Sequence, residues 1–182
     1  MILKAVGRLA LRRAAELYSE ALVTLAGNTL SDDLMSKLLC YEGYDTQQQD
    51  FFIEGHGRRW YRAQLGQGRS GQPREPRPIM ELSQINNLLG VTLETSSPTV
   101  VTNWVRYQMG RKETREAWGG TGLGKQVVAD INKIKNDMAS EVARAAFSDQ
   151  VGDQHIQMAH ITLVRLYAGY LKRWFVAKGG QK

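Results

Sequence analysis

Residues 153–176, DQHIQMAHITLVRLYAGYLKRWFV, are the stretch that decides the fold of this 182-residue chain. Their apolar side chains recur every three or four positions, which is the repeat of an amphipathic α-helix and not the alternation of a β-strand. The pattern predicts one long helix, which Asp153 is placed to cap and Gly179-Gly180 to end. We expect its core face to consist of Ile156, Ala159, Leu163, Leu166, Tyr170 and Trp174.

The segments before this helix have the same spacing. A glycine-rich break at 119–124 precedes a second long helix, whose seam is Val127, Ile131, Ile134, Met138, Val142 and Ala145. Ser96-Ser97-Pro98 is a helix-start signal, with Ser97 as the cap. Pro98 stands at the first helical position, where its missing N–H costs nothing. That helix is expected to continue toward Trp118 and to bury Val101, Trp104, Val105 and Gln108 or Met109. A shorter stripe before it consists of Leu82, Ile85, Leu88 or Leu89, and Thr92.

The first part of the chain also has helical periodicity. One helix is expected to end at Gly27-Asn28 and to bury Leu3, Val6, Ala10, Ala14, Leu17, Ala21 and Leu25. Ser31 is placed to cap a second helix, which would continue through Leu34, Leu38 and Tyr41 and close at Gly43.

The composition changes between Gly55 and Pro78, where six arginines stand against a single acid, Glu75, which leaves a net charge of +5. Three prolines in this stretch forbid a continuous helix. We therefore predict an N-terminal helical segment at 1–66, a basic linker at 67–78 and a C-terminal helical bundle at 79–178. The fold class is all-α, a compact helical bundle of about five to six helices with a Gly/Pro/Arg-rich linker in the middle.

Composition excludes several classes of protein. Cys40 is the only cysteine, so an internal disulfide or a thiolate metal cluster cannot form. No window approaches eighteen uninterrupted apolar residues, so we expect no membrane partner. The Arg-rich start resembles an organellar transit peptide, but it lacks serines and its helical pattern continues through Glu16 to Ala26. We expect a cytoplasmic protein.

Residues 119–126, GGTGLGKQ, match most of the phosphate-loop pattern of nucleotide-hydrolysing enzymes. The position after Lys125 needs a hydroxyl to ligate magnesium, and Gln126 has none. The loop would also need a preceding strand, whereas 104–118 has the pattern of a helix. We interpret the run as a glycine-rich turn between helices, with anion binding at the following helix N-terminus as an alternative.

Other chemical groupings are weak. His155 and His160 lie five apart, about 140° around a helix, which is not the spacing of a metal site, and His56 stands alone. We interpret them as helix-surface or capping histidines, and Cys40 as a buried thiol. We therefore predict no enzyme, no catalytic residue, no metal site and no cofactor.

Arginine next to an aromatic residue recurs three times, at 58–62, 104–112 and 170–175. Guanidinium groups bind phosphates and exposed rings stack on bases, so these groups suit RNA or another single strand. Trp104 and Trp174 lie on apolar stripes, which favours the core. Arg106, Arg111, Lys112 and Arg115 crowd one segment with only Glu113 and Glu116 to offset them, which favours an anionic partner.

The runs ELSQINNLLG at 81–90 and VVTNWVRYQMGR at 100–111, with two further amphipathic helices, resemble the small helical subunit of type III CRISPR effector complexes. The resemblance covers about residues 79–178. It implies a non-catalytic RNA-binding subunit that stacks along a ribonucleoprotein filament in antiviral defence. The implied partners are guide RNA and target RNA, the backbone and large subunits, and neighbouring copies of itself.

The matching segment would bring Arg106, Arg111 and Lys112 to the RNA, with Lys125 and Lys133 on the adjoining helix. Such small subunits are often little longer than the matching part, so Arg58, Arg59 and Arg62 would form an extra RNA-contacting arm or dock on a neighbouring subunit. A helical DNA-binding or adaptor protein unrelated to CRISPR is the alternative.

Overall fold

The computed structural model describes residues 2–39, 78–148 and 151–180. These residues form eight α-helices and two π-helical turns, which confirms the all-α class. The bounds are α1 Ile2–Glu16, α2 Ser19–Thr29, α3 Asp32–Leu39, α5 Leu82–Glu94, α6 Pro98–Gly110, η2 Glu116–Gly120, α7 Leu123–Ile134, η3 Lys135–Ala139, α8 Ser140–Phe147 and α9 Asp153–Ala177. None of the helices in these ranges has the length and apolar character that a bilayer span requires.

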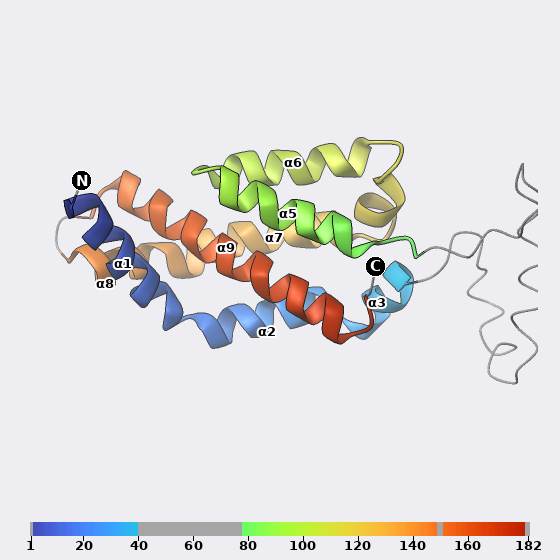
Figure 1. Cartoon of the computed structure of the whole chain (residues 1–182), viewed down its shortest axis with the longest axis horizontal. Helices are drawn as coiled ribbons and strands as arrows, with labels where there is room; N and C mark the ends of the chain where they lie inside the picture. The colour runs from blue at the N-terminus through green and yellow to red at the C-terminus, as the bar shows by residue number, and fades with distance from the viewer. Residues whose placement is uncertain (1, 40–77, 149–150, 181–182) are drawn as a thin grey trace, which may run out of the picture.

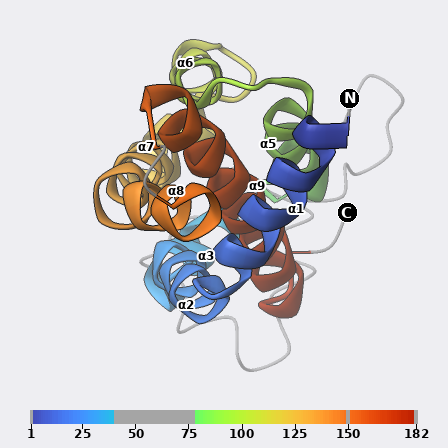
Figure 2. The same ribbon diagram turned by 90° about the vertical axis from the view of Figure 1, so that its left-hand side faces the viewer.

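Helix α9 is the centre of the bundle. It runs diagonally along the molecule in Figure 1, and the end-on view in Figure 2 shows the other helices arranged around it. Because α9 packs against α1, α2, α5, α6, α7 and α8, its buried face is broad. That face consists of Ala159, His160, Ile161, Leu163, Val164, Tyr167, Ala168, Leu171 and Phe175.

The expected core face of α9 was wrong by about one position. Ala159 and Leu163 are buried as predicted, but Leu166, Tyr170 and Trp174 are only half-buried. Each of these three is followed by another large apolar residue, so periodicity does not choose between the two. Contact with the surrounding helices selects the second of each pair, namely Tyr167, Leu171 and Phe175.

The ends of α9 agree with the prediction at one terminus only. The cap position is Gly152 and not Asp153, which is the first helical residue. The Gly152 N–H donates to Nδ1 of His155 at 3.2 Å, so a histidine completes this end. At the other end Gly179 has φ +97°, which favours glycine, and the Gly180 N–H donates to the Phe175 carbonyl at 2.9 Å.

The number of helices exceeds the expected five to six because two expected helices are each divided. The first is broken at residues 17–18 into α1 and α2, and Leu17 and Ala21 are exposed where burial was predicted. The second long helix contains the π-helical turn η3 between α7 and α8. The helix that starts at Pro98 does not continue to Trp118 but ends at Gly110, and Trp118 lies in η2.

Residues on both sides of 40–77 share one core. Helix α2 packs on α9 and α7, and α1 packs on α8 and α9. The Met80 N–H donates to the Leu38 carbonyl at 3.0 Å, which ties α3 to the segment before α5. The predicted linker up to residue 77 and the predicted end of the second helix at Tyr41 and Gly43 lie outside the described residues.

Candidate functional site

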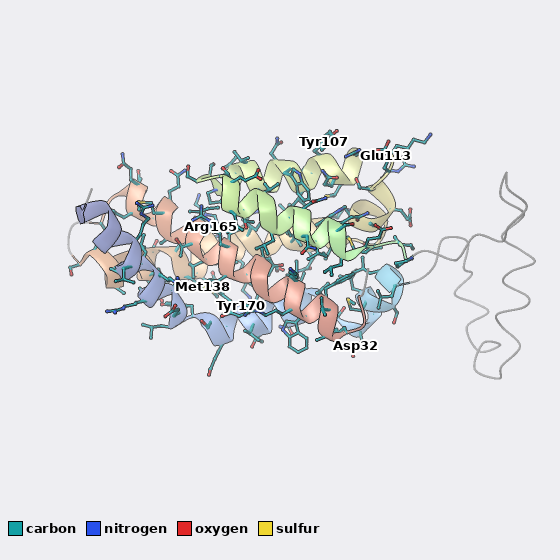
Figure 3. All side chains as sticks on the ribbon, in the orientation of Figure 1. Asp32, Tyr107, Glu113, Met138, Arg165 and Tyr170 are labelled. Atoms are coloured by element: carbon teal, nitrogen blue, oxygen red, sulfur yellow. The ribbon has the colours of Figure 1, made fainter. Side chains whose placement is uncertain are left out.

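The basic residues expected to bind RNA on α6 and after it are all exposed. Arg106 lies on the outer face of α6 beside Tyr107, whose side chain is 61% exposed, while Val101, Val105 and Gln108 face inward. Lys112 and Arg115 follow the end of the helix. Tyr107 and Glu113 lie on the α6 side of the bundle, away from α2 (Figure 3). Arg106, Lys112 and Arg115 have no side-chain hydrogen bond or ion pair with another described residue.

Arg111 differs from its neighbours because it has an intramolecular partner. Its Nε donates to Oε2 of Glu113 at 2.8 Å, and both side chains are about half exposed or more. The pKa of Glu113 is lowered below its ordinary value, first by a hydrogen bond from the backbone of Glu113 itself and second by the bond from Arg111. Arg111 is thus partly neutralised, and exposed pairs of this kind contribute little to stability.

Two further basic residues expected to bind RNA, Lys125 and Lys133, lie on α7. Helix α7 packs against α6, and both lysines are exposed without a partner among the described residues. The two lysines are eight residues apart, which places them about 80° from each other around the helix axis, so they share one side of α7. We call these five exposed cations, Arg106, Lys112, Arg115, Lys125 and Lys133, the cationic strip.

The other two arginine and aromatic groups do not add to this strip. Arg58, Arg59 and Arg62 lie outside the described residues. In the group at 170–175, Nε1 of Trp174 donates to the Val23 carbonyl at 3.0 Å. Its ring lies so close to Gly27 that a Cβ there would be 3.1 Å from it. Trp174 therefore joins α9 to α2 and is not free to stack on a base.

The glycine-rich run has the predicted role of a turn between helices. Gly119 and Gly120 end the π-helical turn η2, α7 begins at Leu123, and between them Gly122 has φ +88°, a conformation that favours glycine. The N–H groups of Thr121 and Gly122 donate to the carbonyls of Glu116 and Gly119 at 3.1 and 3.2 Å. The Leu123 N–H is 3.3 Å from the Thr121 hydroxyl. These three amides are therefore already used within the turn.

The interpretation of the histidines is half right. His155 completes the α9 terminus as described, and its ring stacks on Phe147 with centroids 4.2 Å apart. His160 is buried, however, and its Nε2 lies 2.9 Å from the Ile131 carbonyl, just before η3. Because a carbonyl only accepts, Nε2 carries the proton. Burial lowers the pKa of His160, and Lys135 acts in the same direction. His56 and Cys40 lie outside the described residues.

A buried polar cluster was missed by the sequence analysis. Asp130 is 2% exposed and accepts hydrogen bonds from Tyr167 at 2.7 Å, from Gln126 at 2.9 Å and from the Thr29 hydroxyl. Burial, and then the Asp130 charge, raise the pKa of Tyr167 well above its ordinary value. The available signal was that Asp130 occupies a seam position between Val127 and Ile134. The described residues contain no group of three or more His, Cys, Asp or Glu suited to a metal ion.

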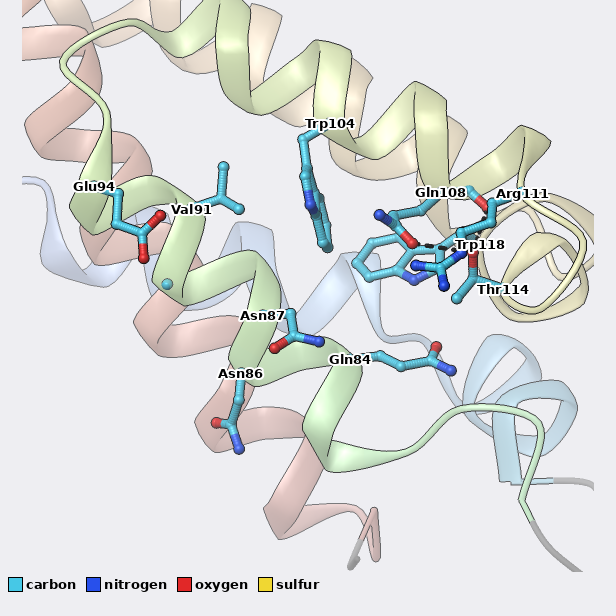
Figure 4. A pocket seen from close by; sticks show the side chains of 11 residues that line it. Gln84, Asn86, Asn87, Val91, Glu94, Trp104, Gln108, Arg111, Thr114 and Trp118 are labelled. Atoms are coloured by element: carbon cyan, nitrogen blue, oxygen red, sulfur yellow. Dashed lines mark hydrogen bonds between the residues drawn. The ribbon is translucent and has the colours of Figure 1, made fainter.

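A pocket of about 350 Å³ lies between α5 and α6 (Figure 4). Helix α5 contributes Gln84, Asn86 and Asn87, α6 contributes Trp104 and Gln108, and Arg111 and Trp118 close one end. This pocket was also missed, although it contains Arg111. Its residues come from two helices and a turn, and no spacing within one helix marks them as neighbours.

Comparison with known proteins gives no match to any protein-family model, to any curated protein or to any solved structure.

Proposed function

We propose that the protein is a non-catalytic, RNA-associated small subunit of a type III CRISPR ribonucleoprotein effector complex. The observation that supports this most is the cationic strip, five exposed cations on α6, on the turn after it and on α7. Their side chains have no partner among the described residues, so an external anion can bind them without first breaking an internal ion pair. The resemblance of residues 79–178 to the small helical subunit supports RNA as that anion.

The physical basis of binding is charge neutralisation along a sugar-phosphate backbone. Each cation that contacts a phosphate releases condensed counterions, which makes affinity fall as salt rises. Exposed Tyr107 beside Arg106 adds a ring on which a base can stack. Backbone contacts of this kind carry no sequence information, as suits a subunit that holds whichever guide and target are present.

The proposal includes stacking along a filament, with guide RNA, target RNA, the backbone and large subunits and neighbouring copies as partners. Arg58, Arg59 and Arg62 remain candidates for an additional contact. A pull-down of the tagged protein from its native host tests this part. Recovery of short repeat-derived guide RNAs with several partner proteins supports the proposal, and recovery of the protein alone at low salt contradicts it.

Binding of single-stranded RNA at several salt concentrations tests the strip itself. Replacing Arg106, Lys112 and Arg115 together by Gln removes three contacts, which should reduce the slope of log affinity against log salt by about 2. Arg13, Arg144 and Arg173 are exposed on α1, α8 and α9, so replacing them by Gln gives a control with the same loss of charge. Equal effects of the two triple variants would contradict the proposal, and tighter binding to duplex DNA would favour the alternative DNA-binding protein.

A further inference from the structure

Two residues that line the pocket between α5 and α6 each carry a buried polar atom without a partner among the described residues. The two atoms are Nε1 of Trp118, a donor, and Oε1 of Gln84, an acceptor. Trp118 is fully buried, and its indole forms one end of the pocket (Figure 4). A buried polar group without a hydrogen bond costs free energy, and most such groups in proteins are satisfied. Neither atom has surface open to the pocket, so an occupant that accepts and donates hydrogen bonds would reach them only after the lining side chains shift.

The pocket also offers an aromatic wall. The Trp104 side chain descends from α6 into it and is half-buried. The rings of Trp104 and Trp118 are T-shaped, with centroids 5.5 Å apart and planes at 85°. This edge-to-face contact stabilises the position of the Trp104 ring, which offers an aromatic surface to a flat ligand.

The remaining polar lining is rich in amides and also contains one cation, Arg111, the carboxylate of Glu94 and the hydroxyl of Thr114. Asn86 and Asn87 each carry both a donor and an acceptor, whereas Oε1 of Gln108 already accepts from Thr114 and leaves that residue as a donor. Arg111 adds the guanidinium donors that its bond with Glu113 does not use. Amide and guanidinium groups of this kind read the edges of nucleobases. A volume of about 350 Å³ is at the small end of ligand pockets, which suits one base and not a whole peptide.

We propose that this pocket takes up a single unpaired nucleobase of the bound RNA. The inference rests on the proposed function, because the strand must first be held by the cationic strip. Arg111 lines the pocket, and Lys112 and Arg115 follow it in the chain, so phosphates bound by these residues would lie near the base. The protein would then contact an unpaired base as well as the sugar-phosphate backbone.

Gly90 allows the pocket to be filled without disturbing the fold. It lines the pocket in α5, and a Cβ added there would meet nothing within 4 Å. Gly90→Leu should therefore leave the helix intact and occupy the space of the base. Gly169 in α9 is equally open and lies outside the pocket, so Gly169→Leu is the matched control. Thermal melting of both variants checks that they fold.

The first measurement compares a single-stranded RNA with an abasic strand of the same length. The wild type should bind the abasic strand on the order of tenfold more weakly, which is the loss of one stacked base. Gly90→Leu should bind both strands alike with an unchanged salt dependence, and Gly169→Leu should behave as the wild type. If the wild type binds both strands equally well, the inference of a base-binding pocket is wrong, whereas the proposed function is not contradicted.

The second measurement does not depend on RNA binding. The indole N–H signal of Trp118 is followed by NMR while guanosine, adenosine, cytidine or uridine is added at millimolar concentration. At least one nucleoside should shift it in the wild type and in Gly169→Leu, but not in Gly90→Leu. No shift with any of the four would overturn the inference. A shift together with absent RNA binding would instead contradict the proposed function.

Discussion

The hydroxyl of Tyr167 on α9 donates to Oδ2 of Asp130 on α7 at 2.7 Å, inside the core. Thr29 at the end of α2 also donates to this carboxylate, and Gln126 reaches its other oxygen. One buried carboxylate therefore joins three helices. A buried charge is tolerated when several hydrogen bonds satisfy it, and each donor then matters more than a surface hydrogen bond.

The Tyr167→Phe variant removes one donor and leaves the carboxylate buried. We expect the free energy of unfolding to fall by about 1–3 kcal/mol, measured by urea titration. Tyr170→Phe is the control, because the Tyr170 hydroxyl has no hydrogen bond to a described residue and the ring keeps its contact with Arg173. Its effect should stay within about 0.5 kcal/mol. Equal effects of the two variants would contradict a role for the cluster.

Stability should fall as the pH rises above 10. The pKa of Tyr167 is raised in the folded protein from its ordinary value of 10.0, chiefly by burial. Above that pH the unfolded chain loses a proton that the folded chain keeps, so unfolding becomes more favourable. The pKa of Tyr18 is raised too, by its hydrogen bond with Glu141, so the measurement uses a Tyr18→Phe background. Adding Tyr167→Phe should flatten the alkaline decline, and an unchanged slope would refute this assignment.

Stability should also fall as the pH drops below 6.5. Burial lowers the pKa of His160 from its ordinary value of 6.5, so at lower pH the unfolded chain takes up a proton that the folded chain does not. His160→Gln keeps a side-chain donor for the Ile131 carbonyl but does not titrate. Urea midpoints between pH 5 and 8 should depend less on pH in this variant than in His155→Gln. A stronger pH dependence in His160→Gln than in His155→Gln would show that another group causes the loss of stability at acidic pH.

Gly124→Ala should destabilise the turn between η2 and α7. A Cβ at this position would lie 2.6 Å from Cγ of Met109 and 2.8 Å from the Trp118 carbonyl oxygen, so backbone has to move. We expect a loss of about 1–3 kcal/mol in thermal melting. Gly169→Ala is in open space within a helix and should gain about 0.5–1 kcal/mol. A neutral Gly124→Ala would mean that the turn relaxes freely.

Arg165→Lys should cost about 1–2 kcal/mol, because one guanidinium satisfies two carbonyls at the end of α5. Nε of Arg165 donates to the Thr92 carbonyl at 2.8 Å, and Nη2 donates to the Thr95 carbonyl at 2.9 Å. A lysine ammonium cannot reproduce this fork. Arg173→Lys, at an exposed position on the same helix, should be nearly neutral in the same urea titration. An Arg165→Lys variant as stable as the wild type would show that these carbonyls find other partners.

The local sequence determined where several helices begin and turn. Pro98 starts α6, Gly122 forms the turn before α7 within the predicted glycine-rich run, and Gly179 follows the end of α9, as predicted. These features depend on the backbone preferences of one or two residues. They can therefore be predicted without knowing what packs against them.

The periodicity correctly predicted the buried side of α5, with Ile85, Leu88 and Thr92, and of α7, with Val127, Ile131 and Ile134. Only the tertiary structure decided which side of α9 is buried and which polar residues meet. Neighbouring apolar residues such as Tyr170 and Leu171 satisfy the helical repeat equally well, and the contacts of α9 with its neighbours select Leu171. Asp130 meets Thr29 and Tyr167 across separations of 101 and 37 residues. The residues that line the pocket between α5 and α6 come from these two helices and from the segment after α6. Helical periodicity records interactions three or four residues apart, so it contains no information on these distant contacts.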